Sequence, residues 1–155
     1  MDVEILKKVA LFQGLNSAQL RKVGAALKTV EFPIGSHVFH EGDTGLSMYI
    51  IAEGKVRISK LVPGIGEEAL AILEKGQYFG EMSLIEDGPR SADAIAHSSC
   101  ALYELSREKL DQVMFTDKEL ASVLLWTFVR TLSARLRETN DKIRAFFALS
   151  SFGPR

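Results

Sequence analysis

The chain is most distinctive at Phe79-Gly80-Glu81-Met82-Ser83-Leu84 and, shortly after, at Asp87-Gly88-Pro89-Arg90-Ser91-Ala92. Gly80 allows the backbone to approach a bound molecule closely, because it has no side chain. The carboxylate of Glu81 can accept hydrogen bonds from vicinal hydroxyls, and the planar, permanently charged guanidinium of Arg90 suits a phosphate. Small residues such as Ser83 and Ser91 leave backbone N–H groups free to point at an anion. The two runs therefore indicate a site for a sugar phosphate.

These runs resemble the phosphate-binding cassette of the cyclic nucleotide-binding domain family. The matching positions are Phe79, Gly80, Glu81, Met82, Ser83, Leu84, Pro89, Arg90, Ser91 and Ala92. The resemblance implies that Glu81 takes the ribose 2′-hydroxyl. It also implies that the cyclic phosphate is bound by Arg90, Ser91 and the backbone N–H groups of Gly80, Met82 and Ser83. The alternative, a simple pairing of Glu81 with Arg90 on a turn, would suit an isolated pair better than the whole string.

The middle of the chain has the pattern of a β-domain. Nine of the 12 glycines fall between Gly35 and Gly88, where they separate short β-like runs at 37–40, 47–52, 55–62, 67–73, 92–97 and 101–105. In several runs apolar and polar residues alternate, as at 56–59. Short strands at regular spacing with glycine turns favour an antiparallel sandwich or barrel.

The same family resemblance extends to both sides of this region. Phe39-His40-Glu41-Gly42-Asp43, and then Met48-Tyr49-Ile50-Ile51-Ala52-Glu53-Gly54, look like the front of the family domain, so that the resemblance covers residues 3–150. It implies a mainly β fold, an eight-stranded antiparallel β-roll (jelly roll) with flanking helices. We expect one domain over residues 1–155, with a helical lead-in at 1–30, the roll at 31–107, the cassette at 79–92 and C-terminal helices at 108–148.

The last segment predicts a long helix. Thr116-Asp117-Lys118-Glu119 has the spacing of a capping box, and neither proline nor glycine occurs again before Gly153. Apolar residues follow a heptad, at Leu125, Val129, Leu132, Leu136, Ile143 and Phe146, interrupted by Thr139. At about 1.5 Å per residue the helix would run for about 45 Å, too long to lie entirely on a small barrel. A homodimer through a parallel two-stranded coil is expected, although packing on the barrel explains the first half equally well.

Thr139 and Asn140 are candidate base-binding residues. Residues 135–142 resemble the dimer helix of the catabolite activator-type members of the family. There, a threonine and the following serine bind the adenine, one from each subunit. Asn140 replaces that serine, and its amide both donates and accepts hydrogen bonds. The alternative role for Thr139, fixing the register of the coil, is compatible with base binding.

Other classes of function have little support. The net charge is −1, and acidic residues interleave with the basic ones of the last helix, which favours a solvated face over a nucleic-acid surface. The single cysteine, Cys100, is expected to be a buried small residue. His37 and His40 would point to opposite faces of a strand, so no metal site is expected. No catalytic constellation is present, and we expect neither enzyme activity nor a cofactor.

The sequence thus predicts a cyclic nucleotide sensor with no membrane-spanning segment and a cytoplasmic location. Ser91 and the Thr139-Asn140 pair resemble adenine-reading members of the family, which favours cyclic AMP over cyclic GMP. No helix-turn-helix is seen after the long helix. The signal is therefore expected to pass to an unknown downstream protein. The alternatives are a ligand-independent interaction scaffold and the regulatory fragment of a transcription factor.

Overall fold

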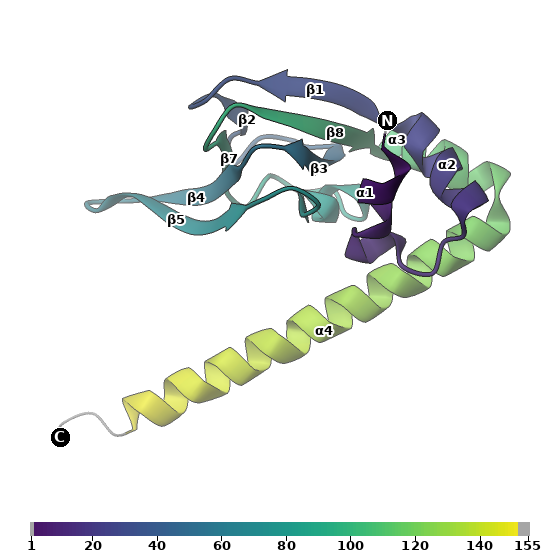
Figure 1. The fold of residues 1–155 in the computed structure, drawn as a ribbon. Coiled ribbons are helices and arrows are strands. Elements are labelled where there is room, and N and C mark those ends of the chain that lie inside the picture. The colour runs from purple at the N-terminus through teal and green to yellow at the C-terminus, as the bar shows by residue number, and fades with distance from the viewer. Residues whose placement is uncertain (1, 152–155) are drawn as a thin grey trace.

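The structure is a computed structural model that describes residues 2–151. The chain begins with α1 (Val3–Lys7), the 3-10 helix η1 (Ala10–Phe12) and α2 (Ser17–Ala26), and it finishes with α3 (Arg107–Thr116) and α4 (Lys118–Ser150). The strands lie between these helical segments. Figure 1 shows the short helices gathered at one end of the strands, while α4 extends past the strands toward the side of the β4–β5 hairpin.

The eight strands form two antiparallel sheets. Their bounds are β1 (Lys28–Phe32), β2 (His37–Phe39), β3 (Ser47–Glu53), β4 (Val56–Val62), β5 (Gly66–Leu73), β6 (Tyr78–Phe79), β7 (Asp93–Ala96) and β8 (Cys100–Ser106). The strand orders are β1-β8-β3-β6 and β2-β7-β4-β5. The predicted fold, an eight-stranded antiparallel roll with flanking helices, is confirmed.

Two strands were missed by the sequence pattern. β1 pairs with β8 at the edge of its sheet and has no fully buried residue, although Val30 and Phe32 alternate with exposed residues and pack against the cluster inside the roll. β6 has two residues, too few for any alternation, and it pairs with β3 through Tyr78 and Phe79. This short pairing matters for the site, because it fixes the backbone immediately before Gly80.

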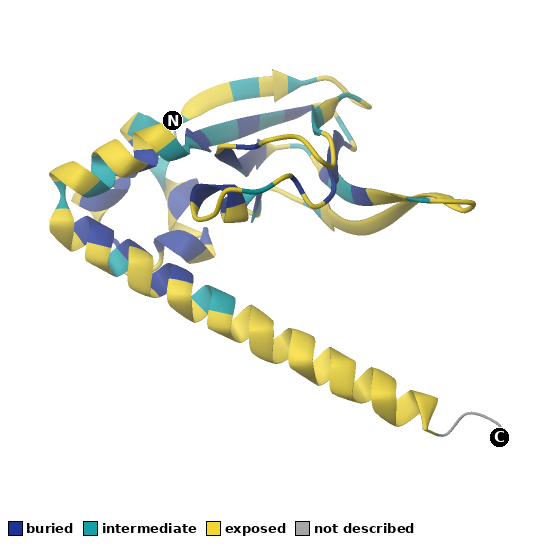
Figure 2. Ribbon diagram, turned by 180° about the vertical axis from the view of Figure 1, so that it is seen from behind, coloured by how far each residue is buried: buried dark blue, intermediate teal, exposed yellow. Residues whose placement is uncertain are grey.

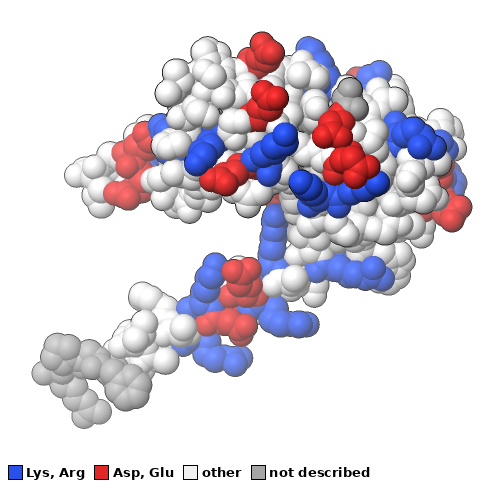
Figure 3. Space-filling model, viewed as in Figure 1, with Lys and Arg blue, Asp and Glu red and all other residues white. Residues whose placement is uncertain are grey.

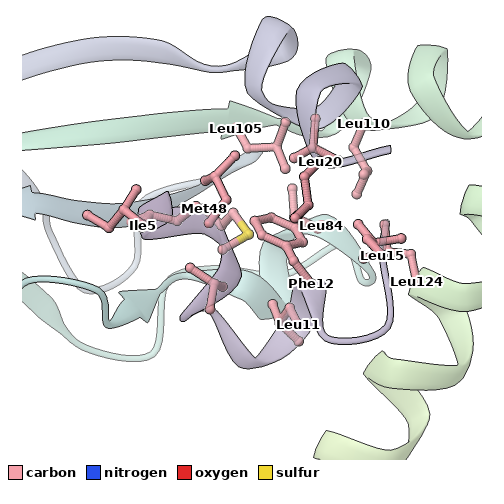
Figure 4. Close-up of a cluster of buried hydrophobic side chains, with 14 of the residues drawn as sticks. Ile5, Leu11, Phe12, Leu15, Leu20, Met48, Leu84, Leu105, Leu110 and Leu124 are labelled. Carbon is pink, nitrogen blue, oxygen red and sulfur yellow. The ribbon is translucent and has the colours of Figure 1, made fainter. Parts of the chain in front are cut away.

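Two hydrophobic clusters lie on opposite faces of the β1-β8-β3-β6 sheet. Met48 and Ile50 belong to the cluster between this sheet and the helices, and Ile51 belongs to the cluster inside the roll. Figure 4 shows the first cluster, in which Phe12, Leu15, Leu20, Leu105 and Leu124 come together. Cys100 lies in the second cluster, and burial raises the pKa of its thiol. Its prediction as a small buried residue is confirmed.

The N-terminal helices are fixed to the roll by this first cluster. Asn16 caps α2 in a capping box in which Asn16 and Gln19 exchange side-chain to backbone hydrogen bonds of 2.9 Å. The segment before it is broken after Lys7 instead of continuing as one helix. Leu6, Val9 and Phe12 of this segment are all buried.

Asp117, and not Thr116, caps the long helix. The Oδ1 atom of Asp117 accepts a hydrogen bond of 2.9 Å from the backbone N–H of Leu120. The predicted capping box at Thr116 was wrong, because Thr116 ends α3 and its hydroxyl donates to the carbonyls of Gln112 and Val113. A second bond, 2.7 Å from Lys22 Nζ to Asp117 Oδ2, connects the start of α4 to α2.

The two halves of α4 differ in environment. Leu120, Leu124 and Phe128 in the first half are buried against the helical end of the roll. From residue 133 onward every described residue is exposed, as Figure 2 shows. Basic and acidic side chains interleave along this exposed half (Figure 3). Within residues 2–151, no helix combines the length and apolarity needed to span a membrane.

Candidate functional site

A pocket of about 460 Å³ lies where the cassette meets the inside of the roll and the middle of α4. Its lining residues come from β2, β4, β6, η2 (Glu81–Leu84), the segment that follows, and α4: Phe39, Ile58, Phe79, Gly80, Glu81, Met82, Ser83, Glu86, Gly88, Pro89, Arg90, Ser91, Ala92 and Arg135. The structure therefore brings six of the eight candidate ligand-binding residues together, namely Gly80, Glu81, Met82, Ser83, Arg90 and Ser91.

Arg90 is a buried cation, with only 6% of its surface exposed. Its Nη1 atom donates to Ser83 Oγ over 2.9 Å and to the Gly80 carbonyl over 3.3 Å, and its Nη2 atom donates to the Ser47 carbonyl over 2.7 Å. The guanidinium also lies 4.0 Å from the centre of the Phe39 ring. These contacts fix the orientation of the group.

Arg90 has no ion-pair partner in the part of the chain that the structure describes. Among residues 2–151 no carboxylate lies within 4.0 Å of its guanidinium, and its buried Nε atom has no hydrogen-bond partner. Burial lowers the pKa of Arg90 from its ordinary value, and Tyr49, Asp43 and Glu104 oppose that effect. An arginine nevertheless remains charged at neutral pH. A buried, oriented and unpaired cation is the chemistry of an anion site.

Two glycines leave room for this guanidinium. A Cβ atom at Gly45 would lie 2.0 Å from Arg90 Nε, and one at Gly80 would lie 2.7 Å from Arg90 Nη1. Gly80 also has a φ of 77°, a left-handed conformation that favours glycine. Gly45 was missed as a site residue, because it lies far from Arg90 in the sequence and no local motif indicates that the two residues are neighbours.

Glu81 is a buried carboxylate at the start of η2, 7% exposed. It pairs with Arg135 of α4, whose Nη2 atom also lies 3.4 Å from the Tyr78 hydroxyl. Burial alone would lower the pKa of Arg135, but the hydrogen bond and charge of Glu81, with a contribution from Tyr78, raise it above its ordinary value. Within the described chain, Glu81 is thus partnered by Arg135 and not by Arg90.

Arg135 was also missed as a site residue, because it was interpreted as one of the basic residues on the solvated face of the last helix. It precedes Thr139 by four residues, so both lie on one face of α4, about 6 Å apart along the helix axis. Thr139 and Asn140 themselves are exposed and do not line the pocket of this single chain. Their role in base binding stays a prediction.

The two neighbouring histidines are arranged differently from the expectation. The rings of His37 and His40 stack, with centroids 4.0 Å apart and planes inclined by 7°. The prediction of opposite faces was wrong, because β2 ends at Phe39 and the strand alternation does not reach His40. In the part of the chain that the structure describes, no group of three or more His, Cys, Asp or Glu side chains is arranged for a metal ion.

The fold is a two-sheet β-roll, and its pocket is lined by a buried arginine that has no carboxylate partner among the described residues. The family profile described as cyclic nucleotide-binding domain matches residues 29–117, which is more than half of the chain. The chain therefore belongs to the cyclic nucleotide-binding domain family.

Two proteins named for cyclic AMP are similar in sequence to this chain. A CRP-like cAMP-activated global transcriptional regulator of Mycobacterium tuberculosis is 34% identical over 140 residues, covering 90% of this chain and 61% of that protein. The cyclic AMP receptor protein of Thermus thermophilus is 38% identical over 103 residues, covering 66% of this chain and 48% of that protein. The chain thus spans about half to three fifths of these relatives.

The fold is also found in solved structures. The N-terminal domain of a transcriptional regulator from Streptomyces coelicolor superimposes with a TM-score of 0.80 at 33% identity, covering 90% of this chain and 94% of that domain. The catabolite activator protein of Thermus thermophilus superimposes with a TM-score of 0.79 at 31% identity, covering 88% of this chain and 62% of that protein.

Proposed function

We propose that this chain is a receptor for cyclic AMP, and not an enzyme, and that the ligand changes the packing of α4. The observation that carries the proposal is Arg90, a buried and oriented cation without a carboxylate partner, in a chain that belongs to the cyclic nucleotide-binding family. A cyclic phosphate would neutralise this charge and satisfy the Nε atom of Arg90.

The remaining pocket residues suit the sugar and the phosphate. Glu81 would accept a hydrogen bond from the ribose 2′-hydroxyl, since its carboxylate lies in the same pocket as Arg90. Ser91 and the backbone N–H groups of Gly80 and Met82 would add donors for the phosphate oxygens. The Ser83 hydroxyl already accepts from Arg90, and its hydrogen is free to point at a phosphate oxygen.

We favour adenine as the base and a homodimer as the receptor. The relatives named for cyclic AMP support the nucleotide, as does the resemblance at Ser91, Thr139 and Asn140. An exposed apolar seam runs along α4, with Val129, Leu136, Ile143 and Phe146 all at least 49% exposed. A second copy packed on this seam would cover it, and would place Thr139 and Asn140 between the two chains near the pockets.

The pair between Glu81 and Arg135 supplies a connection from ligand to helix. The ribose hydroxyl and Arg135 would compete for the same carboxylate, so binding changes the contact that ties α4 to the cassette. A ligand shifts a conformational equilibrium only through such differential contacts. Hydrogen exchange of α4 with and without cyclic AMP tests this step, and identical exchange in both states would contradict it.

Calorimetric titration with cyclic AMP and with cyclic GMP, with molar mass measured in the same buffer, tests the main proposal. We expect tighter binding of cyclic AMP by a dimer. No binding heat with either nucleotide at high micromolar concentration would favour the second candidate, a ligand-independent interaction scaffold. That candidate has support in the Glu81–Arg135 pair, which satisfies the carboxylate without any ligand.

A third candidate has the same ligand but differs in which domain or protein receives the signal. The solved regulator domain and the CRP-like relative suggest a role as the regulatory part of a transcription factor. In that case α4 would pass the signal to a DNA-binding domain. Otherwise the downstream partner is another protein. Co-purification of partners with the complete natural protein, with and without cyclic AMP, distinguishes the two.

A further inference from the structure

Arg107, the first residue of α3, makes a set of contacts that the site described above does not explain. Its Nη2 atom donates to the carbonyls of Ser83 and Glu86, each over 2.7 Å, and its Nε atom donates to the Ser83 carbonyl over 3.2 Å. Its Nη1 atom pairs with Asp87. One guanidinium thus bonds to Ser83 in η2 and to Glu86 and Asp87 in the segment that follows.

The carbonyl bonds matter more than the ion pair. Asp87 is 91% exposed, and such a surface pair contributes little. The carbonyls at the end of a helix, by contrast, have no partner within the helix and need one from elsewhere. Arg107 provides it for Ser83 in η2 and also bonds to the carbonyl of Glu86, just beyond that helix, and the flat fork of an arginine reaches both in a way that a lysine ammonium does not.

Ser83 connects Arg107 to the guanidinium of Arg90. Its carbonyl accepts from Arg107, and its hydroxyl accepts from Arg90 Nη1 over 2.9 Å. The backbone N–H of Arg107 also donates to the Leu46 carbonyl over 2.8 Å, next to Ser47, whose carbonyl accepts from Arg90 Nη2. Two of the three hydrogen-bond acceptors of the Arg90 guanidinium, those of Ser83 and Ser47, therefore lie beside a contact of Arg107.

We propose that Arg107 is a positioning residue for the ligand, which holds residues 83–87 in the shape that presents Arg90 to the phosphate. This inference rests on the proposed function, since it assigns Arg107 a part in that same site. Arg107 does not itself line the pocket, although it bonds to Ser83 and Glu86, which do. It belongs to α3, so it also ties the cassette to the helices.

Two variants, Arg107→Gln and Arg107→Lys, test the proposal. Arg57→Gln is a matched control, because the side chain of Arg57 has the same exposed fraction, 23%, and pairs with Glu67 on the outer face of its sheet. Without ligand, we expect faster amide exchange at residues 80–92 in Arg107→Gln than in the unaltered chain, with no such change in the control.

With cyclic AMP, we expect Arg107→Gln to bind about tenfold more weakly, Arg107→Lys to lie between, and Arg57→Gln to stay within about twofold. A double-mutant cycle with Arg90→Lys separates positioning from general loss of structure. If Arg107 acts through Arg90, its effect shrinks in the Arg90→Lys background, whereas independent effects multiply.

The outcomes are distinguishable. Unchanged exchange, unchanged affinity or fully multiplicative effects, together with binding by the unaltered chain, would overturn the role of Arg107 and leave the proposed function standing. Absence of cyclic AMP binding by the unaltered chain would overturn both.

Discussion

Arg90 shows how a single residue can be buried as a charged group and held in one orientation. Burying a cation is costly unless its hydrogen bonds are made, and here two carbonyls and a hydroxyl make them. None of these partners carries a negative charge. The group is thus held in place and remains electrostatically unsatisfied, a state that an anionic ligand relieves.

The first prediction concerns this charge. Arg90→Ala should weaken cyclic AMP binding by roughly 1.5–3 kcal/mol, the usual range for a hydrogen bond to a charged group. Calorimetric titration measures the change. Lys60→Ala, which removes an exposed basic residue paired with Glu41, should leave the affinity unaltered. An Arg90→Ala protein that binds as tightly as the unaltered chain would show that the phosphate lies elsewhere.

The second prediction concerns Gly45. In Gly45→Ala the new methyl group would meet Arg90 Nε at 2.0 Å, so the guanidinium has to leave its position. Because Gly45 has an ordinary φ, we expect a large loss of cyclic AMP affinity with a small loss of thermal stability. Gly35→Ala is the contrasting control. Its φ of 83° makes alanine strained, but no atom lies within 4 Å, so it should lower stability and not affinity. Melting curves and titrations of both variants decide the matter.

At the scale of elements, the sequence predicted what is local. The cassette lies within 14 consecutive residues, 79–92, so its glycine, carboxylate and arginine could be identified together. β6 and the partners of Glu81 and Arg90 could not be predicted in this way. β6 is too short for a pattern, and Gly45, Arg107 and Arg135 reach the site only through the packing of distant elements.

The third prediction concerns the junction of α3 and α4. The hydrogen bond from the Leu120 backbone, then that from Lys22, lowers the pKa of Asp117 below its ordinary value of 3.8. The charged form is therefore favoured in the folded state, and this contribution to stability is present above pH 3.8 and lost as the pH falls below it. Melting temperatures between about pH 6 and about pH 3 should fall less steeply in Asp117→Ala than in the unaltered chain. Asp117→Asn keeps an acceptor for the cap, so at neutral pH it should be more stable than Asp117→Ala.

At the scale of the whole molecule, the roll and the exposed half of α4 are two different kinds of structure. The roll has its own buried clusters, whereas α4 beyond residue 132 has no buried residue in this chain. Isolated helices gain little from hydrogen bonding alone in water, and most helical stability in proteins comes from packing. The exposed seam is therefore the surface on which a second copy is expected.

The fourth prediction tests that interface. Ile143→Lys places a charge in the seam, and light scattering should then show a monomer, because two buried ammonium groups would face each other in a parallel pair. Ala145 lies two residues further along and is not one of the apolar heptad positions that form the seam. Ala145→Lys should therefore remain dimeric. Since both positions are exposed in the single chain, the roll should stay folded in both variants. A dimer in Ile143→Lys would exclude this seam as the interface.

The pairing of Arg135 with Glu81 also has a mechanical consequence. From Arg135 to the end of α4 at Ser150 the helix is a rigid arm of about 22 Å, at about 1.5 Å per residue. A tilt of about 10° about Arg135 would therefore displace the far end by about 4 Å, most of one helical turn of about 5.4 Å. The Glu81–Arg135 pair, for which we propose that the ribose competes, thus lies at the pivot of this arm. A small change there would produce a larger displacement where the two helices of a dimer would meet.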